Sequence, residues 1–207
     1  MIPKTVHQIW LGGLENRPPR IGESMSQIET VFRSLGYDYR PWTEADLQAL
    51  DIATFADIRP YAALSDLMRY QILALHGGWY IDADCLPASE SPALPNDVDI
   101  FVINSHQPKR FFNTVLGAAP GHVLMRDAAH RAADVFRRVQ SGQRLKRDVA
   151  WLVGPGLLFR LCRKHKIRPR PWVRWMAHFD PEVPILHPKL HSWKGQAIHV
   201  AKKEGEK

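Results

Sequence analysis

The chain has 207 residues, of which 45% are hydrophobic, and a formal net charge of +7. This length and apolar content predict a single domain with its own core, spanning residues 1–207. No run approaches the roughly 20 apolar residues of a membrane span, and Cys85 and Cys162 are too few for a disulfide scaffold. No apolar leader precedes Lys4, so we expect a cytoplasmic protein.

The first third of the chain alternates between strand and helix signals. Residues 4–10 predict a strand that ends at the glycine pair 12–13, and residues 21–35 carry apolar side chains at helical spacing. Residues 37–40 predict a second strand, followed by short helical pieces at 43–50, capped by Thr43, and at 53–58. This order predicts an α/β fold with a parallel or mixed sheet covered by helices on both faces.

Residues 65–84 are the most informative segment. Leu67, Met68, Ile72 and Leu75 fall on one helical stripe, and the double glycine 77–78 predicts its end. Ser65 is the expected N-cap of this helix.

Two charged residues of the same helix, Asp66 and Arg69, lie three positions apart and therefore share a face. Near the positive end of the helix they could hold the anionic or hydroxyl groups of a ligand. The alternative is a surface ion pair of little energetic value.

A β-prone run, Trp79-Tyr80-Ile81, leads directly into Asp82-Ala83-Asp84. Strand alternation would send both carboxylates to one side, where they repel each other unless a cation lies between them. Mn²⁺ or Mg²⁺ would relieve that repulsion and leave coordination positions for phosphate oxygens.

The second half of the chain continues the α/β pattern. Residues 98–104 predict a strand, residues 122–140 an amphipathic helix, and the stretch from Gly156 to about residue 166 another helix. Prolines dominate the remainder, which we expect to be mostly loop. No internal repeat or linker marks a second domain.

The 65–84 segment resembles the sugar-nucleotide-binding core of glycosyltransferase family 32, whose relatives include the catalytic domains of clostridial glucosylating toxins. The first strand with its glycine pair, Gly121-His122, and the Gly154-Pro155-Gly156 turn are similar to that family too. The resemblance implies a GT-A-type fold, with a nucleotide-sugar core at 1–105 and an acceptor-side, basic part at 106–207.

The resemblance also implies roles for individual residues. Asp84 would bind the metal directly, and Asp82 would reach the ribose or, through water, the metal. The donor sugar and phosphate would be gripped by Arg69 and Asp66. Four further residues would line the nucleotide-sugar site: Ile9, Trp10, Ser65 and Tyr80. As the catalytic residues we expect Asp82, Asp84 and Arg69. A further metal ligand would come from the C-terminal part, where His199 is the first candidate and His191 the weaker one.

By resemblance, the reaction transfers a hexose from a UDP- or GDP-linked sugar to a polysaccharide or lipid-linked glycan, with retention of anomeric configuration. The basic segment between Arg160 and Trp175, with interleaved tryptophans, would then rest against anionic membrane headgroups. No nucleic acid partner is expected under this interpretation. The segment could instead be a solvated face with core tryptophans.

Two other classes of protein stay open. Haloacid-dehalogenase-type phosphatases also place Asp-x-Asp after a strand, with the first carboxylate as nucleophile, but they usually carry it on their first strand. A non-enzymatic module that binds glycans or nucleic acid through the Arg and Trp cluster is the second.

Overall fold

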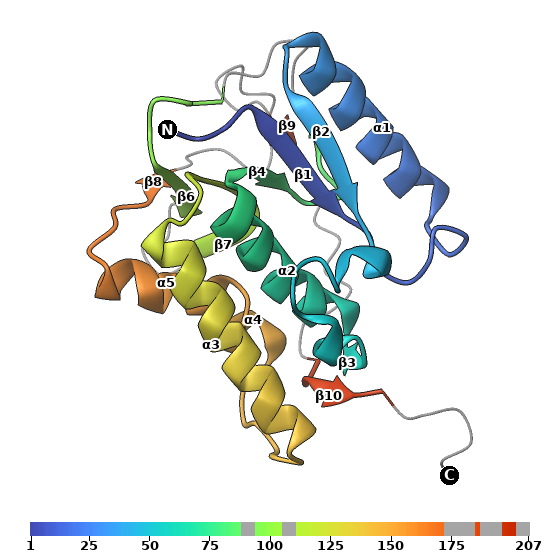
Figure 1. Ribbon diagram of the computed structural model, residues 1–207, viewed down its shortest axis with the longest axis vertical. Helices are drawn as coiled ribbons and strands as arrows, with labels where there is room; N and C mark the ends of the chain where they lie inside the picture. The colour runs from blue at the N-terminus through green and yellow to red at the C-terminus, as the bar shows by residue number, and fades with distance from the viewer. Residues whose placement is uncertain (88–93, 105–110, 172–184, 187–195, 202–207) are drawn as a thin grey trace.

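The computed structural model describes residues 1–87, 94–104, 111–171, 185–186 and 196–201. Figure 1 shows a sheet with helices on either side. The helices are α1 (Pro19–Ser34), α2 (Tyr61–His76), α3 (Val123–Gln140), α4 (Val149–Leu152) and α5 (Pro155–Lys164), with 3-10 turns η1 (Glu44–Asp46) and η2 (Ala53–Phe55). The strands are β1 (Thr5–Ile9), β2 (Asp38–Trp42), β3 (Ile58–Arg59), β4 (Gly78–Ile81), β5 (Leu86–Pro87), β6 (Ile100–Asn104), β7 (Phe111–Ala118), β8 (Arg170–Pro171), β9 (Ile185–Leu186) and β10 (His199–Val200).

The main sheet has the strand order β2-β1-β4-β7-β6-β8. The pairs β2–β1, β1–β4 and β6–β8 are parallel, while β7 runs antiparallel to both β4 and β6. The sheet is therefore mixed, as predicted, and β7 joins the N-terminal parallel strands to the strands that follow.

Alternating side chains of the strands fill two cores, one on each face of the sheet. On one face, Val6, Trp79 and Val115 pack with Ile28 and Phe32 of α1. The other face carries Tyr80 and Leu116, which pack with residues of α2, α3 and α5. Figure 1 shows α1 on one side of β1 and β2, and α2 with α3 on the other.

The sequence predicted most of these elements within two or three residues. The strands predicted at 4–10, 37–40 and 98–104 correspond to β1, β2 and β6, and the helices predicted at 21–35, 122–140 and from Gly156 correspond to α1, α3 and α5. β2 continues through Pro41 because it is an edge strand, where a missing N–H removes no ladder bond.

The short helical pieces predicted at 43–50 and 53–58 are present as 3-10 turns, and Thr43 caps the first as predicted. Both are shorter than predicted, and residues 58–59 are strand β3. Two other details differ from the prediction. Ser65 is not an N-cap, because α2 begins at Tyr61, directly after Pro60. The sequence interpretation also missed β7, which is eight residues long.

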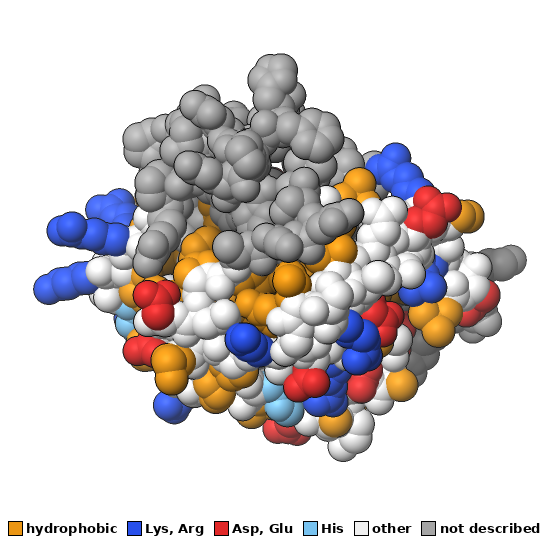
Figure 2. Space-filling view, turned by 90° about the horizontal axis from the view of Figure 1, so that it is seen from above, with side chains coloured by type: hydrophobic (Ala, Val, Ile, Leu, Met, Phe, Trp, Pro, Cys, Tyr) orange, Lys and Arg blue, Asp and Glu red, His pale blue; other side chains and the backbone are white. Residues whose placement is uncertain are grey.

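Figure 2 shows one face of the molecule, on which hydrophobic side chains gather in the middle and charged side chains lie toward the edges. Lysine, arginine and acidic side chains are intermixed along those edges. The positive net charge therefore does not make this face uniformly basic. Within the part of the chain that the structure describes, no helix has the length and apolar content needed to cross a bilayer.

A buried histidine joins β1 to the turn between α2 and β4. His7 Nε2 lies 3.0 Å from the carbonyl oxygen of Gly77, and the indole N–H of Trp42 donates to His7 Nδ1 at 3.1 Å. These partners fit a neutral ring with its proton on Nε2. Gly78 has φ +91° and leaves no room for a side chain, since a Cβ there would lie 2.8 Å from His7 Nε2.

Because His7 is buried in its neutral form, we expect the free energy of unfolding to fall at acidic pH. Burial lowers the pKa of His7 to about 4. The hydrogen bond to Gly77 raises this pKa, whereas the charges of His76 and Arg40 lower it further. An unfolded histidine titrates near 6.5, so stability is complete above that pH and falls as the pH drops toward 4. We expect about 2 kcal/mol of the free energy of unfolding to be lost between about pH 7.5 and pH 5 through this residue.

Urea unfolding of the wild type and His7→Gln at both pH values measures this effect. The variant should be less stable at neutral pH but should lose about 2 kcal/mol less on acidification. His130→Gln is the matched control, because His130 is 71% exposed on α3 and should keep the wild-type pH dependence. Equal acid losses in His7→Gln and the wild type would contradict the assignment.

Candidate functional site

The two acids of the Asp82-Ala83-Asp84 motif lie in a turn, not in a strand. β4 ends at Ile81, so strand alternation does not set the direction of the two side chains. The backbone nevertheless fixes the turn: Asp82 N donates to Thr114 O at 2.8 Å, and its carbonyl accepts from Cys85 N at 3.0 Å and Gln8 Nε2 at 3.1 Å. A half-buried acidic turn is thus held at the end of β4, beside β1 and β7.

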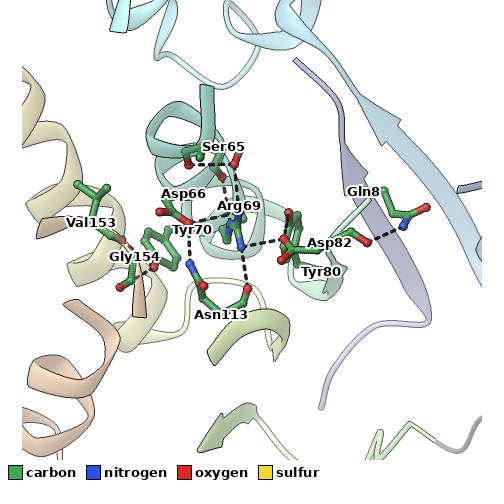
Figure 3. Close-up of polar contacts among 11 residues, drawn as sticks. Gln8, Ser65, Asp66, Arg69, Tyr70, Tyr80, Asp82, Asn113, Val153 and Gly154 are labelled. Carbon is green, nitrogen blue, oxygen red and sulfur yellow. Dashed lines mark hydrogen bonds and ion pairs between the residues drawn. The ribbon is translucent and has the colours of Figure 1, made fainter. Parts of the chain in front are cut away.

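Arg69 lies at the centre of the site, enclosed by acceptors from three parts of the chain (Figure 3). Five oxygens lie within 3.2 Å of its guanidinium nitrogens: Ser65 O, Ser65 Oγ, Asn113 O, Asp66 Oδ1 and Asp82 Oδ1. A guanidinium carries five N–H groups, so these acceptors match its donor capacity. Its side chain is 7% exposed, so a surface ion pair is excluded.

The charge of Arg69 is fixed by its neighbours. Burial disfavours the charged form, but Tyr80, Asp82 and Asp66 together raise its pKa above the ordinary value. The Tyr80 ring lies under the guanidinium, with 4.4 Å between the guanidinium carbon and the ring centroid. Arg69 therefore acts as a permanent buried cation between two carboxylates.

Asp66 is a buried carboxylate that faces the turn between α4 and α5. Its Oδ1 accepts from Asn113 Nδ2 at 2.6 Å and lies 3.2 Å from Arg69 Nη2. Burial raises its pKa to about 7, with Asp82 acting in the same direction and Arg69 and Asn113 against it. A Cβ placed on Gly154 would lie 3.1 Å from Asp66 Oδ2, a contact so tight that a side chain there would push the turn and the carboxylate apart.

Two residues predicted from the sequence, Tyr80 and Arg69, hold the side chain of Asp82. The Tyr80 hydroxyl donates to Asp82 Oδ1 at 2.7 Å, and Arg69 Nη1 lies 3.0 Å from the same oxygen. Burial raises the pKa of the neighbouring Cys85 thiol well above its usual value, and the negative charges of Asp82 and Asp84 raise it further. The two acids thus create a local negative potential at the turn.

Ser65 belongs to the same cluster, although it does not cap the helix. Its hydroxyl donates to Ala62 O at 3.0 Å and accepts from Arg69 Nη2 at 3.1 Å. It therefore helps to hold Arg69 from one turn earlier on α2.

The two residues predicted at the end of the first strand lie in different environments. Ile9 is buried in the core, and Trp10, just beyond β1, is half-buried. The indole of Trp10 donates to Gly13 O at 2.9 Å, and Glu44 accepts from Gly12 N. Trp10 is thus tied to the glycine turn that follows β1.

The structure does not bring the proposed histidine ligand to the acidic turn. His199 is exposed on β10, which pairs with β3. Among the residues described, no group of three or more His, Cys, Asp and Glu side chains could hold a metal ion. His191 and the region from 172 to 175 of the basic segment lie outside the described residues.

Comparison with known proteins identifies the region that contains this cluster. Residues 23–109 match the family model described as a glycosyltransferase sugar-binding region containing a DXD motif. The matched range includes Asp66, Arg69, Asp82 and Asp84. This part of the chain is therefore similar to a glycosyltransferase sugar-binding region. The resemblance drawn from the motifs is thereby confirmed.

A curated relative of the chain agrees with the match. The uncharacterized glycosyltransferase L373 of Acanthamoeba polyphaga mimivirus is 28% identical over 133 residues, which are 59% of this chain. The aligned part is 52% of that protein, so the chain spans about half the length of the relative.

One solved structure has a fold similar to that of this chain, and a second resembles it less. The ligand-free glycosyltransferase domain from the YGT toxin has a TM-score of 0.52 at 10% identity, over 86% of this chain and 81% of that one. The PaToxG glycosyltransferase has a TM-score of 0.49 at 15% identity, over 79% of this chain and 70% of that one. The GT-A-type fold predicted from the sequence is confirmed.

The acidic turn Asp82-Ala83-Asp84 fits a hard divalent cation. Mg²⁺ and Mn²⁺ take oxygen ligands, and Mg²⁺ is commonly bound by one or two protein carboxylates together with substrate phosphates. Asp82 and Asp84 supply carboxylates in a half-buried turn of negative potential. Two protein ligands suffice in such a site, so His199 is not required.

The sequence interpretation missed Asn113, whose side chain and backbone both belong to the site. Asn113→Ala removes the 2.6 Å donor to buried Asp66. We expect a loss of about 1–3 kcal/mol in the free energy of unfolding, together with weaker donor-sugar hydrolysis. Denaturant unfolding and a hydrolysis assay check both effects.

The matched control is Asn16→Ala, because Asn16 makes exposed hydrogen bonds after β1. It should change stability by no more than about 0.5 kcal/mol. If the free energy of unfolding and the hydrolysis rate of Asn113→Ala equal those of the wild type, Asp66 needs no hydrogen-bond donor from β7.

Proposed function

We propose that this chain is a metal-dependent glycosyltransferase that moves a hexose from a UDP- or GDP-linked sugar to a glycan or lipid-linked acceptor. The observation that carries the proposal is the acidic turn Asp82-Ala83-Asp84, anchored to β7 by its backbone and joined to Asp66 through Arg69. The match of this region to a sugar-binding family model gives the reaction class.

The proposed cation site is Asp84, together with Asp82 directly or through water. When bound there, Mn²⁺ or Mg²⁺ would supply positive charge to the diphosphate as the glycosidic bond breaks. Asp82 is already oriented by Tyr80 and Arg69 through Oδ1. Such preorganisation avoids rearrangement when charge develops on the leaving group.

Arg69 acts as a positioning residue in this proposal, rather than as a direct ligand of the diphosphate. Its guanidinium already has five acceptors within the protein. It therefore fixes Asp66 relative to Asp82, which sets the distance between a sugar-binding carboxylate and the cation site. Asp66 would accept hydrogen bonds from donor-sugar hydroxyls.

The proposal includes two further features that the family resemblance implies. Trp10, with Ile9 behind it, would pack on the nucleobase. The anomeric configuration would be retained by front-face displacement, with the leaving phosphate taking the acceptor proton. A peripheral membrane contact through Arg160–Trp175 remains a prediction.

A donor panel tests the proposed function. UDP- and GDP-sugars are screened for hydrolysis with and without Mn²⁺, and thermal shift with each nucleotide provides a readout independent of turnover. We expect one nucleotide to raise the melting temperature only with Mn²⁺ and its sugar to be hydrolysed in a chelator-sensitive way. Chelator-resistant hydrolysis, or hydrolysis of aryl phosphates alone, would contradict the proposal.

A further inference from the structure

A pocket lies beside α4, the helix that precedes the turn touching Asp66. It is a pocket of about 580 Å³, formed by the segment before α4, by α4 itself and by the segment before β10. Its lining residues are Leu145, Lys146, Arg147, Asp148, Trp151 and Ala197. The pocket contains none of the residues of the acidic cluster.

An exposed tryptophan flanked by arginines forms one wall of this pocket. Trp151 is 42% exposed, which is a large apolar surface to leave in water. The guanidinium carbons of Arg147 and Arg160 lie 5.6 and 4.8 Å from centroids of its ring system. Arg160 Nη1 also donates to Trp151 O at 2.7 Å, which fixes that arginine beside the ring.

The pocket has an excess of positive charge. Lys146 and Arg147 are exposed in its lining, with Arg160 beside it, against a single lining carboxylate, Asp148. Asp148 caps α4, since its Oδ1 accepts from Trp151 N at 3.1 Å. This arrangement complements a ligand that carries an anionic group next to a flat or ring-shaped apolar face.

The pocket is linked to the donor side through the Val153-Gly154 turn. The Tyr70 hydroxyl donates to Val153 O at 2.8 Å, and Gly154 packs against Asp66 (Figure 3). Trp151 precedes this turn by two residues. One short segment, residues 151–154, therefore contains both the pocket tryptophan and the glycine that packs against Asp66.

We propose that this pocket binds the acceptor, and that the acceptor is an anionic sugar. This inference rests on the proposed function, since it gives the second substrate of that reaction. A sugar ring lies against the Trp151 indole, while its phosphate or carboxylate pairs with Arg147, Arg160 and Lys146. The Val153-Gly154 turn then connects acceptor binding to the position of Asp66.

An NMR titration of the full chain tests the pocket without any requirement for turnover. The indole N–H signal of Trp151, assigned with Trp151→Phe, is followed during addition of glucose 1-phosphate, glucuronate, methyl glucoside and inorganic phosphate. We expect saturable shifts with one or both anionic sugars, and at least about five-fold weaker binding of methyl glucoside and of phosphate. The two anionic probes show whether phosphate or carboxylate is the preferred group.

The same titration is repeated with two sets of variants and with lipid vesicles. Arg147→Gln combined with Lys146→Gln should weaken anionic sugar binding about ten-fold, whereas the exposed Arg126→Gln on α3 should not change it. Response to phosphatidylglycerol vesicles but to no sugar probe would overturn the inference in favour of a lipid surface. Equal binding of all four small probes would also overturn it.

The proposed function and this inference can fail separately. If the wild type hydrolyses the donor in a metal-dependent way but no anionic sugar shifts the Trp151 signal, the proposed transferase function stands and the proposed acceptor pocket is rejected. If no donor of the panel is hydrolysed, the proposed transferase function is rejected.

Discussion

Asp84→Asn should abolish metal-dependent hydrolysis of the donor while leaving the fold intact. Asp84 lies half-buried in the turn after β4, so the isosteric amide is accommodated there. The amide removes the negative charge that anchors the cation, and we expect at least a 1,000-fold loss of turnover, equivalent to about 4 kcal/mol of transition-state stabilisation. Hydrolysis rates at saturating Mn²⁺ and far-UV circular dichroism measure the two parts of the prediction.

Two further variants serve as controls for the Asp84→Asn result. Asp97→Asn removes another carboxylate, exposed and beyond the acidic turn, and should keep wild-type turnover. Asp82→Asn should lose both turnover and stability, because Asp82 is bonded to Tyr80 and Arg69. Normal turnover in Asp84→Asn would refute the assignment of the metal site.

Arg69→Met should be the most destabilising single substitution in the site. It leaves Asp66 and Asp82 without their shared cation and removes the donors to Ser65 and Asn113. Removal of one partner of a buried ion pair costs about 3–5 kcal/mol. Arg69→Lys should also be strongly destabilised, since an ammonium has three donors and cannot reproduce the planar arrangement.

A double variant separates the electrostatic cause from a loss of packing. Arg69→Met combined with Asp66→Asn should recover part of the lost free energy of unfolding. Without Arg69, the buried Asp66, whose pKa is already about 7, must either take up a proton or remain an uncompensated charge, and the amide does neither. Arg33→Met is the surface control: Arg33 pairs with Glu29 on α1 and is 54% exposed, so the change should be within about 1 kcal/mol. A loss in Arg69→Met no larger than in Arg33→Met would contradict the central position of this residue.

Local patterns were sufficient to predict the elements that deliver the acidic turn. The apolar stripe of α2, the glycine pair with positive φ at 77 and 78, and the β-prone residues of β4 all act within a few positions. Leu75, predicted on the same stripe, is instead 50% exposed. The predicted proximity of Asp66, Arg69 and Asp82 is also observed. These features depend mainly on short-range geometry.

The role of Arg69 could not be predicted from the sequence, because its environment is tertiary. A surface ion pair and a buried one have the same spacing along α2. What distinguishes them is β7, which brings the Asn113 carbonyl to Arg69 and the Asn113 amide to Asp66. β7 pairs with β4 across more than thirty residues of sequence, and no turn signal between adjacent segments announces such pairing.

The position of His199 also depends on a long-range strand pairing. His199 occurs in a strand-like run, as expected, but that run pairs with β3 instead of approaching the acidic turn. A short strand alone does not specify its partner. The proposed cation site therefore consists of Asp82 and Asp84 with substrate oxygens, without His199.

The most direct test is a crystal soaked with MnCl₂ and the donor nucleotide, with anomalous scattering collected to locate manganese. The account predicts a manganese peak bonded to Asp84, with diphosphate oxygens completing its coordination and Arg69 still bound to Asp66 and Asp82. An acidic turn without manganese, or a diphosphate bound directly by Arg69 with Asp82 displaced, would contradict it.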